Sequence, residues 1–261
     1  MILQRTEQEQ WLSNSYLVID EPGGTGVLID GNGVMEPLLE RLEADGARLT
    51  HILVTHDHHD HLAGLEEVRE HYGAKVVAGA ETAKRAQADG AGLTVDQAIA
   101  DGERLSTGGL EIEAIATPGH AAGHLAFLIN GTDCITGDSL FKGTVAGTLA
   151  PGATGFADLK HSIMERLMKL DPEVRLHPGH REPTTVAAEW EQNPFIRVWR
   201  GLDPEGDEPC RVFGDRDATL VLWAPDYDGT NKAWVRFADV DGSPDGSGAT
   251  DGIVGGSQVT R

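Results

Sequence analysis

Residues 55–61 of this chain read Thr-His-Asp-His-His-Asp-His, a run of histidines and aspartates that begins with a threonine. Four of the chain's 11 histidines lie within it. It follows residues 51–54, which predict a short buried strand, and precedes residues 62–72, whose apolar spacing predicts a helix. A tight loop between them would direct several imidazole and carboxylate groups to one point, and these groups suit zinc and similar divalent ions. The stretch therefore predicts a metal site at the end of a strand.

The donors of this stretch follow an H-x-H-x-D-H pattern, formed by His56, His58, Asp60 and His61. The pattern resembles the signature of the metallo-β-lactamase superfamily. Three further motifs of that family follow in its order: Thr-Pro-Gly-His at 117–120, Thr-Gly-Asp at 136–138 and His-Pro-Gly-His at 177–180. Because four motifs agree in residues and in order, the resemblance extends over roughly residues 12–200.

The resemblance implies a site for two metal ions. It assigns the first ion to His56, His58 and His120. It assigns the second ion to Asp60, His61 and His180, with Asp138 shared between the two ions. The two carboxylates of this set, Asp60 and Asp138, are the predicted catalytic residues. Zinc is the expected metal, and iron and manganese are alternatives because His and Asp ligands accept all three.

Two divalent ions held about 3.5–4 Å apart polarise a carbonyl group and lower the pKa of a bound water towards about 7. The resemblance is to the compact bacterial glyoxalase II-like (hydroxyacylglutathione hydrolase-like) enzymes, which hydrolyse thioesters. We therefore predict that a metal-bound hydroxide cleaves a small thioester or ester. Phe141 and Lys142, which follow the Thr-Gly-Asp motif, are the predicted substrate-binding residues.

The chain departs from full-length glyoxalase II in two places. Arg181 and Glu182 follow the last histidine, where those enzymes commonly carry an acidic residue and then Tyr. The helical C-terminal segment that carries basic residues for the glutathione carboxylates has no counterpart here. Whether glutathione is recognised therefore stays open.

Three other functions stay open. A lactonase would use the same ligands. A mononuclear iron oxygenase of the persulfide dioxygenase type would need only His56, His120 and Asp138, a two-His-one-carboxylate set. A metal-stabilised binding module would carry its function in the residues after 200 and would need no turnover.

The resemblance implies an α/β fold, a four-layer αββα sandwich, for residues 1–200. Strands and helices alternate in this part of the sequence, which is compatible with layered mixed sheets. Residues 201–240 form a predicted strand-rich extension, and residues 241–261, rich in Gly, Ser and Asp, a predicted flexible tail.

The composition of the chain indicates which classes of binding partner are expected. The chain carries 42 acidic against 21 basic residues, for a net charge of −21, so nucleic acid is not expected to bind. Residues 1–10 lack the features of a signal peptide, and no apolar run has the ~20 residues of a membrane helix. The two cysteines, Cys134 and Cys210, form no disulfide framework. We expect a cytoplasmic protein that acts on a small molecule. Because exposed strand edges can pair with a second chain, a homodimer is kept as an expectation.

Three histidines near the motifs are not expected to be ligands. His59 stands at a variable position of the pattern and is predicted to face solvent or the ligands' neighbours. His124 is predicted to support the site, and His177 to pack behind it.

Overall fold

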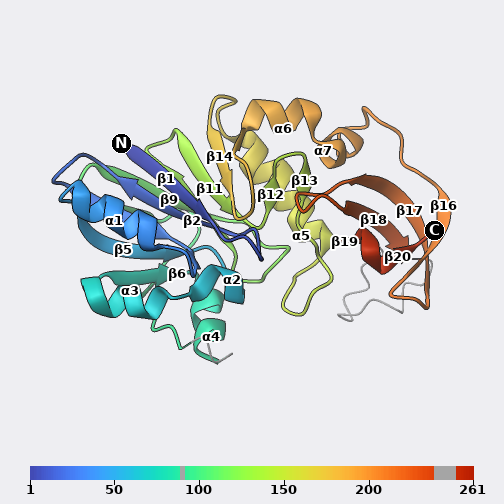
Figure 1. Ribbon diagram of the computed structural model, residues 1–261. Coiled ribbons are helices and arrows are strands. Elements are labelled where there is room, and N and C mark those ends of the chain that lie inside the picture. The colour runs from blue at the N-terminus through green and yellow to red at the C-terminus, as the bar shows by residue number, and fades with distance from the viewer. Residues whose placement is uncertain (89–91, 238–250) are drawn as a thin grey trace. The chain divides into compact units, whose positions relative to one another are not determined.

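The computed structural model describes residues 1–88, 92–237 and 251–261 (Figure 1). The chain divides into two compact units. The first comprises Met1–Ala116, Gly123–Gly137 and Leu176–Arg181. The second comprises Thr117–Ala122, Asp138–Arg175 and Glu182–Arg261.

The first unit contains a six-stranded sheet in the order β1-β2-β3-β5-β6-β7. Its strands are β1 (Ile2–Glu7), β2 (Asn14–Ile19), β3 (Thr25–Ile29), β5 (Arg48–Val54), β6 (Lys75–Ala78) and β7 (Gln97–Ala98). The first three strands pair antiparallel, and β3 through β7 pair parallel. The carboxyl ends of β3 and β5 therefore meet at one edge. The short β4 (Gly31–Asn32) follows β3 there.

A second six-stranded sheet has the order β15-β14-β11-β10-β9-β8. Its strands are β8 (Arg104–Thr107), β9 (Leu110–Ala116), β10 (Leu125–Ile129), β11 (Asp133–Gly137), β14 (Arg175–Pro178) and β15 (Thr184–Thr185). The pairs from β8 to β11 are antiparallel hairpin partners. Strand β11 is buried along its whole length, as expected for a central strand.

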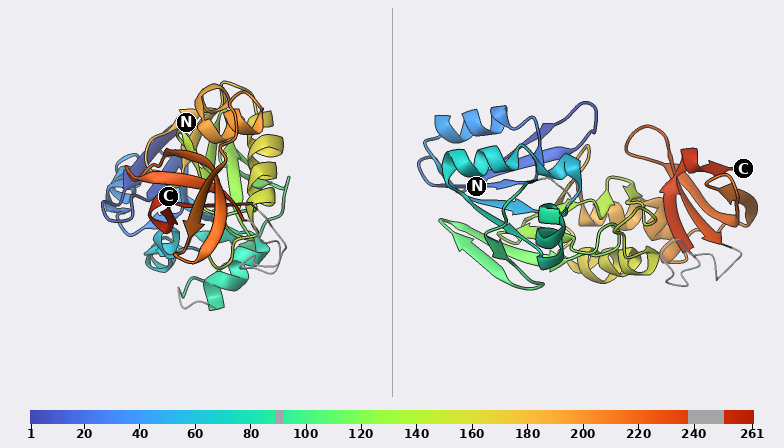
Figure 2. Two further views of the ribbon diagram at one scale, coloured as in Figure 1. Left: turned by 90° about the vertical axis from the view of Figure 1, so that its right-hand side faces the viewer. Right: turned by 90° about the horizontal axis from the view of Figure 1, so that it is seen from below.

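Two apolar clusters fix the layers of the first unit. One side of the first sheet packs on helices α1 (Glu36–Ala44) and α3 (Leu65–Tyr72), through residues such as Leu38 and Leu65. The other side packs on the second sheet, where Phe127 meets side chains of β2 and β3. Figure 2 shows α1 and α3 together on one side of the first sheet. The expected α/β class with mixed sheets is confirmed.

The second unit combines helices with a separate sheet. Its helical elements are α5 (Phe156–His161), a π-helix (Ser162–Arg166), a 3-10 helix (Leu167–Lys169), α6 (Val186–Gln192) and α7 (Pro194–Trp199). A hairpin, β12 (Leu140–Phe141) and β13 (Thr144–Val145), precedes them. The sheet has the order β19-β18-β17-β16-β20. Its strands are β16 (Glu208–Val212), β17 (Arg216–Pro225), β18 (Asn231–Phe237), β19 (Asp251–Gly255) and β20 (Val259–Thr260).

This C-terminal sheet has an apolar core of its own, which contains Val212, Val235 and Val254. Trp234 of β18 stacks on Phe156 at 5.0 Å between ring centroids, which joins the sheet to α5. Within the predicted strand-rich extension, residues 201–240, the structure has strands β16, β17 and β18, the last of which ends at Phe237. Residues 238–240 lie outside the described ranges.

The last residues differ from the expected flexible tail. Residues 251–255 form β19, which pairs antiparallel with β18, and residues 259–260 form β20, which pairs with β16. Ile253 and Val254 are buried in this segment, so apolar contacts outweigh the turn-forming composition around them. Residues 241–250 of the expected tail lie outside the described part of the chain.

Local backbone conformation changes two expected helices. The helix expected at 62–72 is divided into α2 (His59–Leu62) and α3, because Gly64 adopts a left-handed conformation with φ of 79°. Residues 157–170, whose apolar spacing also predicts one helix, leave α-geometry after His161. Among the described residues, no helix combines the length and apolar character needed to cross a lipid bilayer.

Phe127 tests the packing between the two sheets. Its side chain is fully buried, so Phe127→Ala leaves a cavity and should lower the free energy of unfolding by about 3–5 kcal/mol. Urea denaturation measures this change. Val34 is 41% exposed in the same unit, and Val34→Ala should change stability by no more than about 0.5 kcal/mol. Equal effects of the two substitutions would contradict the assigned core.

Candidate metal centre

The first two histidines of the site, His56 and His58, follow the end of β5. His56 is fully buried and His58 is partly exposed. Their ring nitrogens Nε2 and Nδ1 lie 3.0 Å apart, and the ring centroids are 4.6 Å apart. The extended backbone of His58 then turns into α2, where the amide of His61 donates to the His58 carbonyl at 3.0 Å. This one-turn helix presents Asp60 and His61 directly after the first two histidines.

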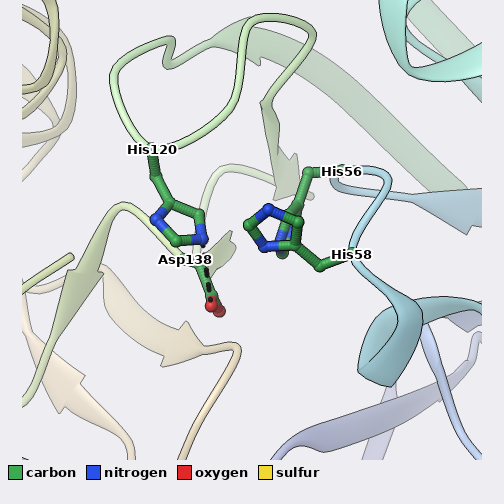
Figure 3. A group of neighbouring side chains, drawn as sticks. All are labelled: His56, His58, His120 and Asp138. Carbon is green, nitrogen blue, oxygen red and sulfur yellow. Dashed lines mark hydrogen bonds and ion pairs between the residues drawn. The ribbon is translucent and has the colours of Figure 1, made fainter. Parts of the chain in front are cut away.

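His120 and Asp138 follow two strands of the second sheet, β9 and β11. His120 Nε2 lies 3.6 Å from Asp138 Oδ2, the pair joined by a dashed line in Figure 3. With His56 and His58 they form one group of metal-ligand type, in which one ligand atom from each residue lies within 4.8 Å of the others.

A second group of the same type consists of Asp60, His61 and His180. The Nε2 atoms of His61 and His180 each lie 3.6 Å from Oδ2 of Asp60. His61 is fully buried and His180 nearly so. The ring centroids of His56 and His61 are 4.4 Å apart, so these histidines of the two groups are in contact.

The donor set and its spacing fit bound divalent ions. Two ligand atoms that each lie about 2.0–2.1 Å from one ion are about 3.0 Å apart in octahedral and about 3.4 Å apart in tetrahedral geometry. The separations of 3.0 Å for His56–His58 and 3.6 Å for His120–Asp138 are close to these values. The 3.6 Å separations around Asp60 Oδ2 are similar.

All seven residues assigned to metal binding from the sequence therefore lie in these two groups. Asp138 belongs to the group of His56, His58 and His120. Its sharing between two ions, and the catalytic roles of Asp60 and Asp138, stay predictions.

The sequence analysis missed Asp30, a buried carboxylate that supports both groups. Asp30 follows β3, is 1% exposed, and adopts a positive φ of 57°. Its Oδ2 accepts from Thr55 Oγ1 at 2.7 Å and lies 3.0 Å from His61 Nδ1. Its Oδ1 accepts from the Thr55 amide at 2.8 Å. Because Thr55 Oγ1 also lies 3.0 Å from His56 Nδ1, one carboxylate orients both imidazoles.

The loop that carries His180 is held by β2. Tyr16 donates to the carbonyl of Pro178 at 2.6 Å, and Asn14 Nδ2 donates to the same carbonyl at 2.9 Å. Burial raises the pKa of Tyr16, so its phenol stays protonated and remains a donor. The Asn14 amide reaches the Arg181 carbonyl as well, at 2.9 Å. These bonds fix the backbone on both sides of His180.

The histidines not expected to be ligands lie outside both groups. His124 is buried, with its ring centroid 5.0 Å from that of His56. His177 Nε2 lies 2.8 Å from Asp133 Oδ1 in a buried pair. His59 is exposed and contacts the edge of Trp11 at 5.2 Å between ring centroids.

The predicted substrate residues differ in exposure. Phe141 is 2% exposed and packs on Tyr227, with ring centroids 4.7 Å apart. Lys142 is exposed. The packing makes Phe141 part of the core of the second unit, and the contact of either residue with a substrate stays a prediction. Cys134 is buried, and burial raises the pKa of its thiol to about 12.

Asp30→Asn should weaken metal binding about 10–100-fold, because the amide that replaces Oδ2 cannot accept from both Thr55 and His61. Zinc affinity measured by competition with a chromogenic chelator tests this. Asp133→Asn is the matched control, since Asp133 also pairs with a histidine in a buried position outside both groups. A similar loss of affinity in both variants would contradict the role of Asp30.

The known proteins that this chain resembles include the following three. A hydroxyacylglutathione hydrolase of Acidiphilium cryptum is 31% identical over 228 residues, which covers 87% of this chain and 83% of that protein. The crystal structure of TTHA1623 in a di-iron-bound form is 30% identical with a TM-score of 0.62 and covers 74% of this chain and 99% of that one. The structure of ETHE1 from Myxococcus xanthus is 26% identical with a TM-score of 0.65, covering 78% and 92%.

The family model for the metallo-beta-lactamase superfamily matches residues 9–180, a range that contains both groups of donors. The solved structures confirm the expected metallo-β-lactamase fold, and the homologues support a metal-dependent hydrolase. The chain belongs to the metallo-beta-lactamase superfamily.

Proposed function

We propose that this protein is a dinuclear metal-dependent hydrolase of a small thioester or ester. The observation that carries the proposal is the presence of two adjacent groups of His and Asp donors, four residues in one and three in the other. A single ion held by the first group would leave Asp60, His61 and His180 without a metal-binding role.

His56, His58, His120 and Asp138 would hold the first ion, and Asp60, His61 and His180 the second, with Asp138 shared. Ions bound by these donors would polarise a substrate carbonyl and activate water for attack. The chain's own contribution is to hold imidazole rings in fixed orientations, which Asp30 and Thr55 do for His61 and His56. Zinc is the first candidate, and the di-iron form of a 30% identical relative makes iron the next.

The thioester preference is supported by relatives that are named hydroxyacylglutathione hydrolases, at 30–34% identity. Recognition of the leaving group is a separate question. The helical glutathione-binding segment expected of full-length relatives is replaced here by the strands β16–β20. Exposed Lys142 would supply one positive charge for an anionic substrate group, in a chain whose net charge is −21.

A mononuclear oxygenase is the second candidate. His56, His120 and Asp138 form a two-His-one-carboxylate set within the first group, which suits a single iron. This candidate makes the second group unnecessary for turnover, whereas the dinuclear hydrolase requires it.

Metal content and hydrolysis together test the proposal. Elemental mass spectrometry on protein purified without added metal should find two metal ions per chain, and S-lactoylglutathione should be hydrolysed. A simple oxygen ester of the same acid serves as a second substrate. One iron per chain, oxygen uptake with a persulfide and no hydrolysis would replace the hydrolase by the oxygenase.

His180→Ala separates the two candidates. Loss of this donor from the second group should remove one ion and lower hydrolysis by about 100-fold or more, if that ion acts as a Lewis acid. His71→Ala is the control, because His71 lies on α3 and outside both groups. Full turnover by a His180→Ala chain that holds one ion would sink the dinuclear mechanism.

A further inference from the structure

The segment 147–149 of the second unit lies between His120 and the C-terminal sheet. On one side, the carbonyl of Gly147 lies 2.9 Å from His120 Nδ1. On the other side, the amide of Thr148 donates to the Ile253 carbonyl at 2.9 Å. The consecutive residues Gly147 and Thr148 therefore link His120, a residue of the first metal group, to strand β19.

The bond to Gly147 determines which nitrogen of His120 faces the site. A carbonyl oxygen only accepts, so it selects the tautomer in which Nδ1 carries the proton. The other nitrogen, Nε2, is then left with its lone pair, and it lies 3.6 Å from Asp138 Oδ2. A fixed tautomer and ring orientation raise the metal affinity of a histidine. The position of the Gly147 carbonyl thus controls His120.

Thr148 connects this carbonyl to β19 by two hydrogen bonds. Besides the bond from its amide, its hydroxyl Oγ1 accepts from the amide of Ile253 at 2.9 Å. Thr148 is 2% exposed and Ile253 is fully buried, so water does not compete for these bonds. A Cβ atom on Gly147 would lie 3.5 Å from the Ile253 carbonyl, which shows how closely the two backbones approach.

The adjacent residue adds an apolar contact. A Cβ atom on Gly252 would meet the Leu149 side chain at 2.8 Å, so Leu149 rests directly on the backbone of β19. Leu149 also packs against the apolar core of the C-terminal sheet. Strand β19 is itself held along its length by β18, from Lys232 to Arg236. The segment 147–149 is therefore attached to a strand that cannot shift alone.

We propose that Thr148 is a positioning residue through which the C-terminal sheet fixes the Gly147 carbonyl and, with it, the tautomer of His120. The sheet lies outside the family match, which ends at residue 180, and nothing in the family motifs assigns it a part in the site. The inference rests on the proposed metal-binding role of His120, and it gives strand β19 of the C-terminal sheet a part in that role.

Thr148→Val tests the proposal, because valine keeps the shape of threonine and removes the hydroxyl that accepts from Ile253. Zinc titrations against a chelator should show one of the two ions bound about 10–100-fold more weakly, with the other unchanged. Thr148→Ser restores the hydroxyl and should restore the affinity. Thr184→Val is the matched control, since it removes another threonine hydroxyl of the second unit, which donates to Glu189 at 2.7 Å.

A second readout needs no metal. In long-range ¹H–¹⁵N spectra of the metal-free full chain, His120, assigned by comparison with His120→Ala, should appear as the single Nδ1–H tautomer. Thr148→Val should give a mixture of tautomers, and Thr184→Val should not. Thermal unfolding of each variant shows whether the fold is retained.

The outcomes separate this inference from the proposed function. If the chain binds no metal but the fixed Nδ1–H tautomer of His120 is lost in Thr148→Val, the hydrolase is contradicted and the link to Thr148 is supported. A folded Thr148→Val chain that keeps both the tautomer and wild-type zinc affinity overturns the inference. An equal loss of affinity in Thr148→Val and Thr184→Val would also overturn it, because the effect would then be general.

Discussion

The buried carboxylate of Asp30 is the constraint on which the site depends. A carboxylate that is 1% exposed is stabilised only if its oxygens accept hydrogen bonds, and here they face the Thr55 amide, the Thr55 hydroxyl and His61. Those partners lie at the start and at the end of the histidine stretch. Because the buried Asp30 carboxylate needs these partners, its hydrogen bonds connect the end of β3 to both ends of the loop after β5 without any bound metal.

The arrangement of the strands makes this constraint effective. Because β3 and β5 are parallel neighbours, their carboxyl ends lie at the same edge of the sheet, where irregular backbone can present side chains. The remaining donors follow the ends of β9, β11 and β14. Rigid strands thus set the positions of the donors, while loops of a few residues set their directions. Hydrogen bonds from Tyr16 and Asn14 to backbone carbonyls hold the loop that carries His180, just as hydrogen bonds to Asp30 hold the loop after β5.

The donors could be predicted from the sequence because their identity and local spacing carry the chemistry. His56, His58, Asp60 and His61 are neighbours in the chain, and all four fall in the two groups. Asp30 could not be found in this way, since a single Asp after an apolar run has many structural roles. The parallel pairing of β3 and β5 was the missing information. The split at Gly64 and the strand β19 were missed because backbone conformation and tertiary burial override composition.

The C-terminal sheet shows why composition is a poor guide to the role of an appended segment. Residues 251–255 are rich in small and polar residues, yet Ile253 provides both partners of the two hydrogen bonds to Thr148. A backbone ladder needs no particular side chain, so such a contact leaves almost no signal in the sequence. Supporting a ligand through a backbone carbonyl also leaves the family motifs unchanged. An extension can therefore support a candidate metal ligand while the family motifs themselves stay in place.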